Sequence, residues 1–216
     1  MKRSAFGGGI KAGGPNYVSC FVEFTENPVL DAGHVTRLSE LLSDEQDVDR
    51  VNAAFANYQK IWEEEFSLEK DVSHVYGEEN LFRYLPVKTM GFRVREADSL
   101  PDIFLVMIAA NTTKTNLTVS ISEKNPNREI IRKIAGIKLV VQDESDFIED
   151  MEKYERIRIT SPEVSDAFYQ KAAKLGKYIA DRKPLVEGRI ELLHYLREQS
   201  IACEYHRYGS IFGERK

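Results

Sequence analysis

The first feature whose residue types could do chemistry is a cluster of five glycines within residues 7–15. Clustered glycines leave backbone N–H groups accessible, and converging N–H groups bind anions. A dinucleotide fingerprint can be laid from Gly7 to Ala12, but it needs a strand before it and a helix after it, and Pro15 and a strand-like segment follow instead. The phosphate-loop pattern from Gly8 also fails, because Gly14 stands where that pattern requires lysine. Two interpretations remain, a cradle for a carboxylate and a tight turn.

The cysteines and histidines form no recognised catalytic or metal-binding pattern. The spacing contains neither CxxC nor HExxH, so we expect no metal site and no catalytic residue among these six: Cys20, Cys203, His34, His74, His194 and His206. Cys20 lies in an alternating apolar segment and is predicted to be a buried structural residue. Cysteine usage this sparse is typical of a reducing cytoplasm.

The composition is that of an ordinary globular protein. The 216 residues are 42% hydrophobic and 30% charged, with a formal net charge of -5 and both signs interspersed. Because no basic stripe stands out, we expect no nucleic-acid partner. The longest apolar run, residues 103–110, is too short to cross a bilayer, and the N-terminus lacks the apolar core of a secretory signal. The expected location is the cytoplasm.

The elements that must position these residues change character along the chain. Residues 17–25 read as a strand, 34–42 as a short helix and 44–66 as a long helix capped by Asp44. From residue 81 onward apolar strands alternate with amphipathic helices. Strands are expected at 81–94 (one or two), 117–121, 137–141, 157–159, 178–179 and 201–205, and helices at 100–111, 128–135, 145–154, 162–175 and 190–197. This alternation predicts an α/β fold, a mostly parallel sheet with flanking helices, preceded by an extended N-terminal arm and helices.

Four widely spaced motifs carry a resemblance to a known family. RSAFGGGIKAGGPNYV (residues 3–18) resembles the end of the aldehyde dehydrogenase module in the glutamate-semialdehyde (1-pyrroline-5-carboxylate) dehydrogenases, closest to the bifunctional proline utilization A enzymes. LFRYLP (81–86), LVEGRIELLHYLREQS (185–200) and YHRYG (205–209) are similar to later segments of the long forms, in the same order. The resemblance implies that the backbone amides of Gly13 and Gly14 hold the α-carboxylate of glutamate semialdehyde, and that residues 17–24 form the closing strand.

The same resemblance implies that the cofactor chemistry has been lost. FLVMIAANTTKTNLTVSIS (104–122) is similar to the helix and strand of an aldehyde dehydrogenase cofactor domain, but Ile121 stands where active members have the lysine that binds the adenosine ribose. An isoleucine side chain cannot make that hydrogen bond. We therefore expect a degenerate, Rossmann-like domain without a cofactor in this chain. NAD, and FAD if the parent enzyme is bifunctional, would be bound elsewhere in the parent.

The resulting hypothesis treats the chain as a C-terminal fragment of an NAD-dependent dehydrogenase of proline catabolism. Residues 1–30 are interpreted as the end of the catalytic module, 31–80 as a helical connector and 81–216 as a non-catalytic α/β domain. The nucleophilic cysteine of that family lies upstream of the anchor loop, so the chain is expected to be inactive alone. Its partners would be the remainder of the parent dehydrogenase or its subunits. The alternative is a stand-alone regulatory or ligand-binding α/β domain.

Overall fold

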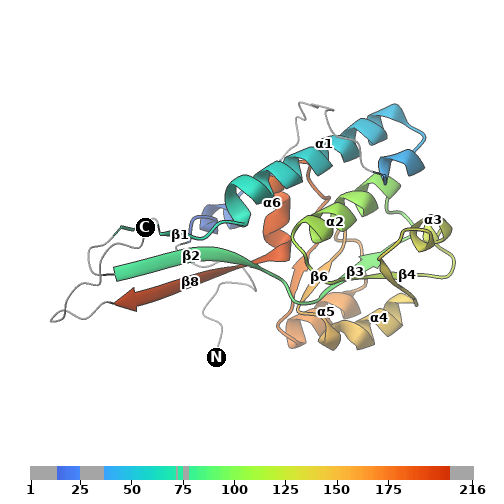
Figure 1. Ribbon diagram of the computed structural model, residues 1–216. Coiled ribbons are helices and arrows are strands. Elements are labelled where there is room, and N and C mark those ends of the chain that lie inside the picture. The colour runs from blue at the N-terminus through green and yellow to red at the C-terminus, as the bar shows by residue number, and fades with distance from the viewer. Residues whose placement is uncertain (1–13, 25–36, 72, 75–77, 205–216) are drawn as a thin grey trace.

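The computed structural model describes residues 14–24, 37–71, 73–74 and 78–204 (Figure 1). The described part is an α/β body from which a long antiparallel ribbon extends to one side. A mostly parallel sheet with flanking helices was predicted from the alternating pattern, and that fold class is confirmed.

The body is built on a five-stranded parallel sheet in the order β5-β4-β3-β6-β7. Its strands are β3 (Met90–Val94), β4 (Leu117–Ile121), β5 (Lys138–Val141), β6 (Arg156–Arg158) and β7 (Tyr178–Ala180). Phe92 at the centre of β3 pairs with Val119 on one side and Arg158 on the other. The strand order reverses between β3 and β6, which makes their carboxyl ends the place where folds of this kind bind a nucleotide.

Helices cover both faces of the sheet and bury a separate core on each. On one face, α2 (Leu100–Thr112) and α1 (Glu45–Ile61) share a core with β3 and β4, together with α3 (Arg128–Arg132) and α6 (Gly188–Glu191) at its margins. On the other face, α4 (Glu144–Asp150) and α5 (Asp166–Lys174) pack aromatic side chains against β6. Helix α2 is buried on nearly all sides because α1 covers its outer surface, which explains why its sequence is apolar without a polar stripe.

The long helix begins where the sequence predicts. Asp44 accepts hydrogen bonds through Oδ1 from the backbone N–H groups of Gln46 at 2.9 Å and Asp47 at 3.2 Å. After Ile61 the helix continues as a π-helical turn, Trp62–Phe66. This turn places Glu65 and Phe66 beside the base of the ribbon.

The ribbon consists of β1 (Lys70–Asp71), β2 (Glu78–Pro86) and β8 (Leu196–Glu204), in the order β1-β2-β8. Strands β2 and β8 pair over nine residues each, from Glu78 opposite Glu204 to Pro86 opposite Leu196. Pro86 is followed closely by β3, so the ribbon base joins the parallel sheet directly. The last predicted helix is shorter than expected, since α6 and the 3-10 helix Leu192–Tyr195 give way to β8 at Leu196.

The predicted strand at residues 17–25 is wrong. Residues 17–21 form a 3-10 helix, in which the Tyr17 N–H donates to the Gly14 carbonyl at 3.1 Å and the Ser19 N–H to the Asn16 carbonyl at 3.0 Å. Aromatic and β-branched residues favour a strand only where a neighbouring strand completes the ladder. No described strand pairs with this segment, so local hydrogen bonds decide its conformation.

Two further expectations concern the segment before α1. Residues 34–36 lie outside the described residues, and only a single 3-10 turn, Ser39–Leu41, is seen in the described part of the predicted 34–42 helix. The three-part division into residues 1–30, 31–80 and 81–216 stays a prediction. Helix α1 packs directly against α2 and contributes Val51, Ala54 and Tyr58 to the same core.

Among the described residues, no helix combines the length and apolar character needed to cross a membrane.

Candidate functional site

The predicted anchor loop is described only at its end. Gly13 lies outside the described residues, whereas Gly14 is half-buried and its carbonyl accepts the Tyr17 N–H. The role of the two glycine amides in binding a carboxylate therefore stays a prediction. The structure does describe how the residues that follow Gly14 are held.

Asn16 fixes this segment to the rest of the chain. Its side chain is 3% exposed, and its amide nitrogen donates to the Tyr84 hydroxyl at 2.8 Å and to Glu198 Oε1 at 2.5 Å. Its amide oxygen accepts a hydrogen bond from Arg189 Nη2 at 2.5 Å. Burial raises the pKa of the Tyr84 phenol, so its oxygen accepts from Asn16 while it keeps its own proton. The Asn16 side chain thus forms hydrogen bonds with side chains of β2, β8 and α6.

Arg189 is the cationic member of this cluster, and its guanidinium group is fixed on three sides. Besides Asn16, it contacts Glu65 with Nε 2.7 Å from Oε2. Its guanidinium carbon also lies 5.3 Å from the centre of the Phe66 ring. Phe66 in turn meets the Tyr84 ring edge to face, with centroids 4.6 Å apart. We call Asn16, Glu65, Phe66, Tyr84, Arg189 and Glu198 the ribbon-base cluster.

Three of the motifs that carried the family resemblance meet in this cluster. Asn16 belongs to the glycine-rich motif, Tyr84 to LFRYLP, and Arg189 and Glu198 to LVEGRIELLHYLREQS. The sequence analysis quoted these segments but did not pair their residues. Only their presence in the same motifs pointed to them, because 68 residues separate Asn16 from Tyr84 and 182 separate it from Glu198.

At the carboxyl edge of the parallel sheet, side chains connect the loop after β3 to the loop after β6. The turn after β3 is closed by Arg95, whose Nη2 lies 2.6 Å from Asp98 Oδ1 and whose backbone N–H donates to Asp98 Oδ2 at 2.8 Å. Arg95 Nη1 also reaches across the strand-order reversal to the Glu163 carbonyl at 2.9 Å, in the connection between β6 and α5. The side chains of one domain therefore link the two loops between which a dinucleotide would lie.

The residues at this edge do not fit NAD. The turn READS (residues 95–99) contains no glycine, although a pyrophosphate needs close approach to the backbone there. Ser99 caps α2, and the Asp98 and Asp102 carboxylates at its N-terminus would repel a phosphate. Ile121, at the position of the family's ribose-binding lysine, is fully buried in the core beneath α2. The described carboxyl edge of the sheet therefore lacks a glycine-lined phosphate site between β3 and α2.

A buried ion pair joins the sheet to α6. Arg158 Nη2 lies 3.0 Å from Glu191 Oε1, and both side chains are 1% exposed. Burial opposes ionisation of Glu191, but the Arg158 charge lowers its pKa below the usual value, so the pair is ionised. Glu191 also accepts from the Tyr195 hydroxyl at 3.0 Å and from the Leu185 N–H at 3.1 Å.

His194 is a structural residue of the same region. Its Nδ1 lies 2.9 Å from the Tyr178 hydroxyl. Burial, together with the charges of Arg158 and Arg156, lowers its pKa to about 4, against the opposing influence of Glu191 and Asp181. His194 is therefore a neutral, hydrogen-bonded residue near pH 7.

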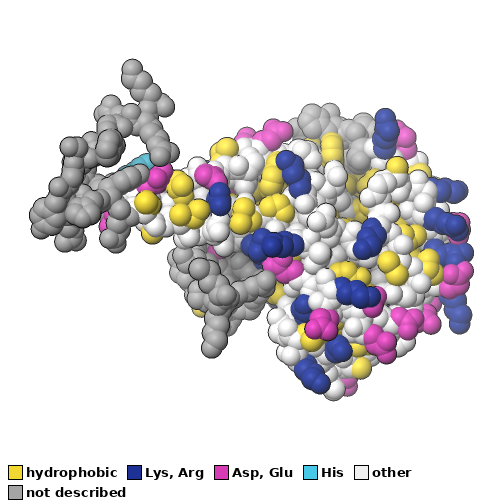
Figure 2. Space-filling model, turned by 60° about the horizontal axis from the view of Figure 1, so that its bottom comes forward, with side chains coloured by type: hydrophobic (Ala, Val, Ile, Leu, Met, Phe, Trp, Pro, Cys, Tyr) yellow, Lys and Arg dark blue, Asp and Glu magenta, His cyan; other side chains and the backbone are white. Residues whose placement is uncertain are grey.

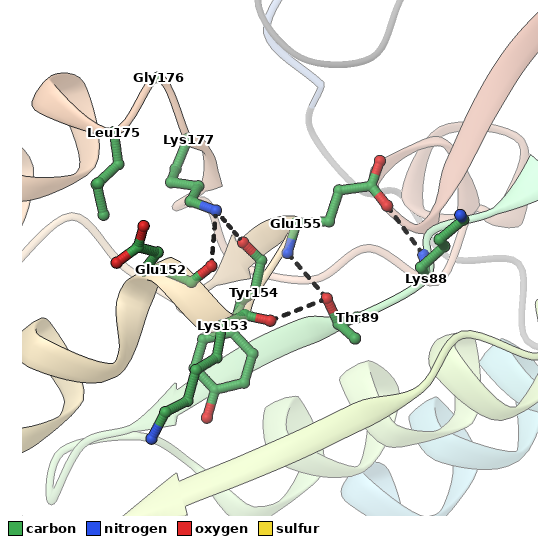
Figure 3. A pocket seen from close by; sticks show the side chains of 9 residues that line it. All are labelled: Lys88, Thr89, Glu152, Lys153, Tyr154, Glu155, Leu175, Gly176 and Lys177. Atoms are coloured by element: carbon green, nitrogen blue, oxygen red, sulfur yellow. Dashed lines mark hydrogen bonds between the residues drawn. The ribbon is translucent and has the colours of Figure 1, made fainter.

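A shallow pocket of about 500 Å³ lies at the opposite, amino-terminal edge of the sheet (Figure 3). Several of its polar groups are engaged with one another. Lys177 Nζ donates to the Glu152 carbonyl at 3.2 Å and to the Tyr154 carbonyl, and Thr89 Oγ1 accepts the Glu155 N–H at 3.0 Å. We assign no chemistry to this pocket, because Lys177 and Glu155 hold the loops that form it.

The remaining candidates add no site. Within residues 14–24, 37–71, 73–74 and 78–204, no three His, Cys, Asp or Glu side chains are grouped as metal ligands. Cys203 is exposed near the tip of β8, and Cys20 lies in the 3-10 helix rather than in a strand. On the face shown in Figure 2, acidic and basic side chains are intermixed over the α/β body.

Comparison with known proteins gives matches only among solved structures. No protein-family model and no curated protein sequence matches the chain. The chain is similar to proline utilization A from Corynebacterium freiburgense, with a TM-score of 0.64 and 26% identity over 94% of this chain. Histidinol dehydrogenase from Elizabethkingia anophelis and PnpE in complex with nicotinamide adenine dinucleotide each match with a TM-score of 0.50 and 16% identity. They cover 67% and 62% of this chain, and 37% and 30% of their own chains, respectively, and show likeness of fold alone.

The match to proline utilization A confirms the resemblance that the motifs predicted. The chain spans only 18% of that protein's length, so the activity of the whole enzyme does not transfer with the fold. The chain is thus similar, in fold and in sequence, to a part of a proline utilization A protein.

Proposed function

Because the chain is similar in fold to part of proline utilization A and its motifs resemble those of that family, we propose that it is a non-catalytic portion of an NAD-dependent glutamate-semialdehyde dehydrogenase. In that enzyme it holds the loop that binds the substrate carboxylate and covers the path of the substrate. The proposal places the nucleophile and the cofactor in the remainder of the enzyme, and it assigns this chain a binding and structural role.

The docking of Asn16 carries the proposal. This residue lies two positions after Gly14, and its side chain is held by three elements of the α/β part of the chain. The Asn16 carbonyl also accepts from the Ser19 hydroxyl at 2.7 Å, which stiffens the turn that follows. A loop whose end is fixed in this way presents its backbone amides in one place, and preorganised amides bind a carboxylate at a lower entropic cost.

The segment after Asn16 offers a surface to the catalytic portion. Val18 and Phe21 are 70% and 64% exposed, and Val22 and Phe24 are also exposed. Four exposed apolar side chains within seven residues are unusual for a surface that faces water only. By the motif resemblance this segment ends the catalytic module, so we assign the covering partner to the rest of that module.

The substrate chemistry assigned to the chain is limited to binding. The amides of Gly13 and Gly14 would donate to the α-carboxylate of glutamate semialdehyde and so place its aldehyde group toward the catalytic portion. This orientation contributes to rate through positioning.

The test uses the enzyme as the cell makes it, either one long polypeptide or this chain with its catalytic partner. Asn16→Ala should raise KM for glutamate semialdehyde roughly tenfold and leave kcat within about twofold, because it loosens binding and leaves the reacting groups in place. Arg128→Lys, at a half-buried arginine of α3 that pairs with Glu123 and Glu129, is the matched control. An unchanged KM in the Asn16 variant would overturn the proposed role of the loop.

A second measurement tests the assignment of catalysis to another portion. The isolated chain should give no NAD reduction with glutamate semialdehyde, even at high protein concentration. Turnover by the isolated chain would contradict the non-catalytic assignment.

A further inference from the structure

We propose that Arg189 is a positioning residue for the substrate site and acts on the carboxylate-binding loop through Asn16. The inference rests on the proposed function. It identifies the side chain by which the α/β body sets the place of a loop that belongs to the catalytic module.

The geometry of Arg189 requires an arginine. Nη2 donates to Asn16, Nε pairs with Glu65, and the flat face of the group lies over Phe66. A guanidinium group can make these three contacts at once because its donors have a fixed fork geometry and its faces stack on aromatic rings. A lysine amine at the same position would have a single nitrogen and no flat face.

A contact with α1 fixes the backbone next to Arg189. The Gly188 N–H donates to Asn57 Oδ1 at 2.6 Å. A Cβ atom at Gly188 would lie 2.9 Å from Tyr58 Cδ1, so the absence of a side chain lets α6 approach α1 this closely. Arg189 therefore starts from a defined position.

The opposite side of α6 is joined to the parallel sheet. Glu191, two residues after Arg189, forms the buried ion pair with Arg158 of β6. A continuous set of contacts thus runs from β6 through α6 and Arg189 to Asn16, and from there by the 3-10 turn to Gly14. Moving Arg189 should shift the loop without unfolding the body.

The first experiment measures hydrogen exchange at the backbone amides of Tyr17 and Ser19 in the full chain. Both amides are hydrogen-bonded in the turn that Asn16 holds. Arg189→Lys should speed their exchange by about tenfold or more and leave exchange in β4 unchanged, since local opening reports only the contacts that close it. Arg128→Lys should change neither, and circular dichroism and the melting temperature verify folding of each variant.

The second experiment measures kinetics in the enzyme that contains this chain. Arg189→Lys should raise KM for glutamate semialdehyde by roughly three- to tenfold with kcat within about twofold, which is the signature of lost binding. Glu65→Gln weakens the hold on Arg189 and keeps the Asn16 contact. It should change both measurements in the same direction by a smaller amount, and it replaces Arg189→Lys if that variant does not fold.

The outcomes separate this inference from the proposed function. Unchanged exchange at Tyr17 and Ser19 in the Arg189 variant, or a uniform rise across the body, overturns the positioning role. If Asn16→Ala raises KM but Arg189→Lys does not, the positioning role fails and the proposed function stands. If exchange rises in both variants while neither changes KM, the proposed function fails and the role of Arg189 in holding the segment is supported.

Discussion

The carboxyl edge of the parallel sheet and the base of the ribbon both gather charged side chains at a junction between elements, yet they use them differently. At the sheet edge, Arg95 pairs with Asp98 and reaches the Glu163 carbonyl, so the charges of the body satisfy one another. At the ribbon base, Arg189 donates to Asn16, a residue from a segment far away in the sequence.

This difference indicates where function can reside. The sheet edge has the strand order of a dinucleotide-binding fold, but Arg95 and Asp98 are bonded to each other and Arg95 also binds the Glu163 carbonyl. The ribbon base uses hydrogen bonds of the body to hold the segment around Asn16, which lies 173 residues before Arg189 in the sequence.

The largest effect is expected from the buried pair of the body. Arg158→Met should lower the free energy of unfolding by about 3–5 kcal/mol, because it leaves the Glu191 carboxylate buried without a counter-charge. Chemical denaturation measures the change. The matched control is Arg182→Ala, whose partner Glu23 is exposed and 3.5 Å away, and which should cost about 0–1 kcal/mol. If the two variants lose similar amounts of unfolding free energy, the buried ion pair is no more important for stability than the exposed one.

Acidification is expected to lower the free energy of unfolding by a somewhat smaller amount. Folding holds the pKa of His194 at about 4, below its ordinary value of 6.5, so between these values the unfolded chain binds one more proton. The stabilising contribution is complete above pH 6.5 and is lost progressively as the pH falls toward 4, by about 3 kcal/mol in total.

Denaturation at a series of pH values measures this slope, and His194→Gln supplies the control because glutamine does not titrate. The variant should show a flatter dependence between pH 6.5 and 4. If the free energy of unfolding depends equally on pH in the wild type and in the variant, groups other than His194 cause the loss of stability.

The smallest effect is expected from NAD at the sheet edge. About 1 mM NAD should shift the melting temperature of the chain by less than about 1 °C, because a ligand stabilises a fold only if it binds the native state. A cofactor-binding aldehyde dehydrogenase measured in parallel is the positive control. A shift of several degrees would mean that the Arg95 bridge opens and that the two regions are more alike than the structure indicates.

The sequence predicted much of the body because its signals are local. Asp44 caps α1 as expected, and the 117–121 strand has the predicted bounds, since an apolar run between turn residues suffices to define it. It failed for residues 17–25, where the alternating pattern is that of a strand but no partner strand is present among the described residues. The sequence analysis also predicted too short a strand at β8, because the helical pattern of residues 190–197 conceals the point at which pairing with β2 begins.

The candidate site was only partly predictable for the same reason. The glycine-rich motif and the family resemblance pointed to Gly13 and Gly14, and the substitution at Ile121 pointed to a lost cofactor site. Neither motif spacing nor composition could indicate that Asn16 meets Tyr84 and Arg189, because hydrogen bonds between distant segments depend on how the ribbon leaves the sheet. By itself the sequence determined the alternation of strands and helices, because the spacing of apolar residues that defines each element is local. Only the tertiary structure decided which polar side chains would share a partner, because burial and distance exist only once the elements have packed.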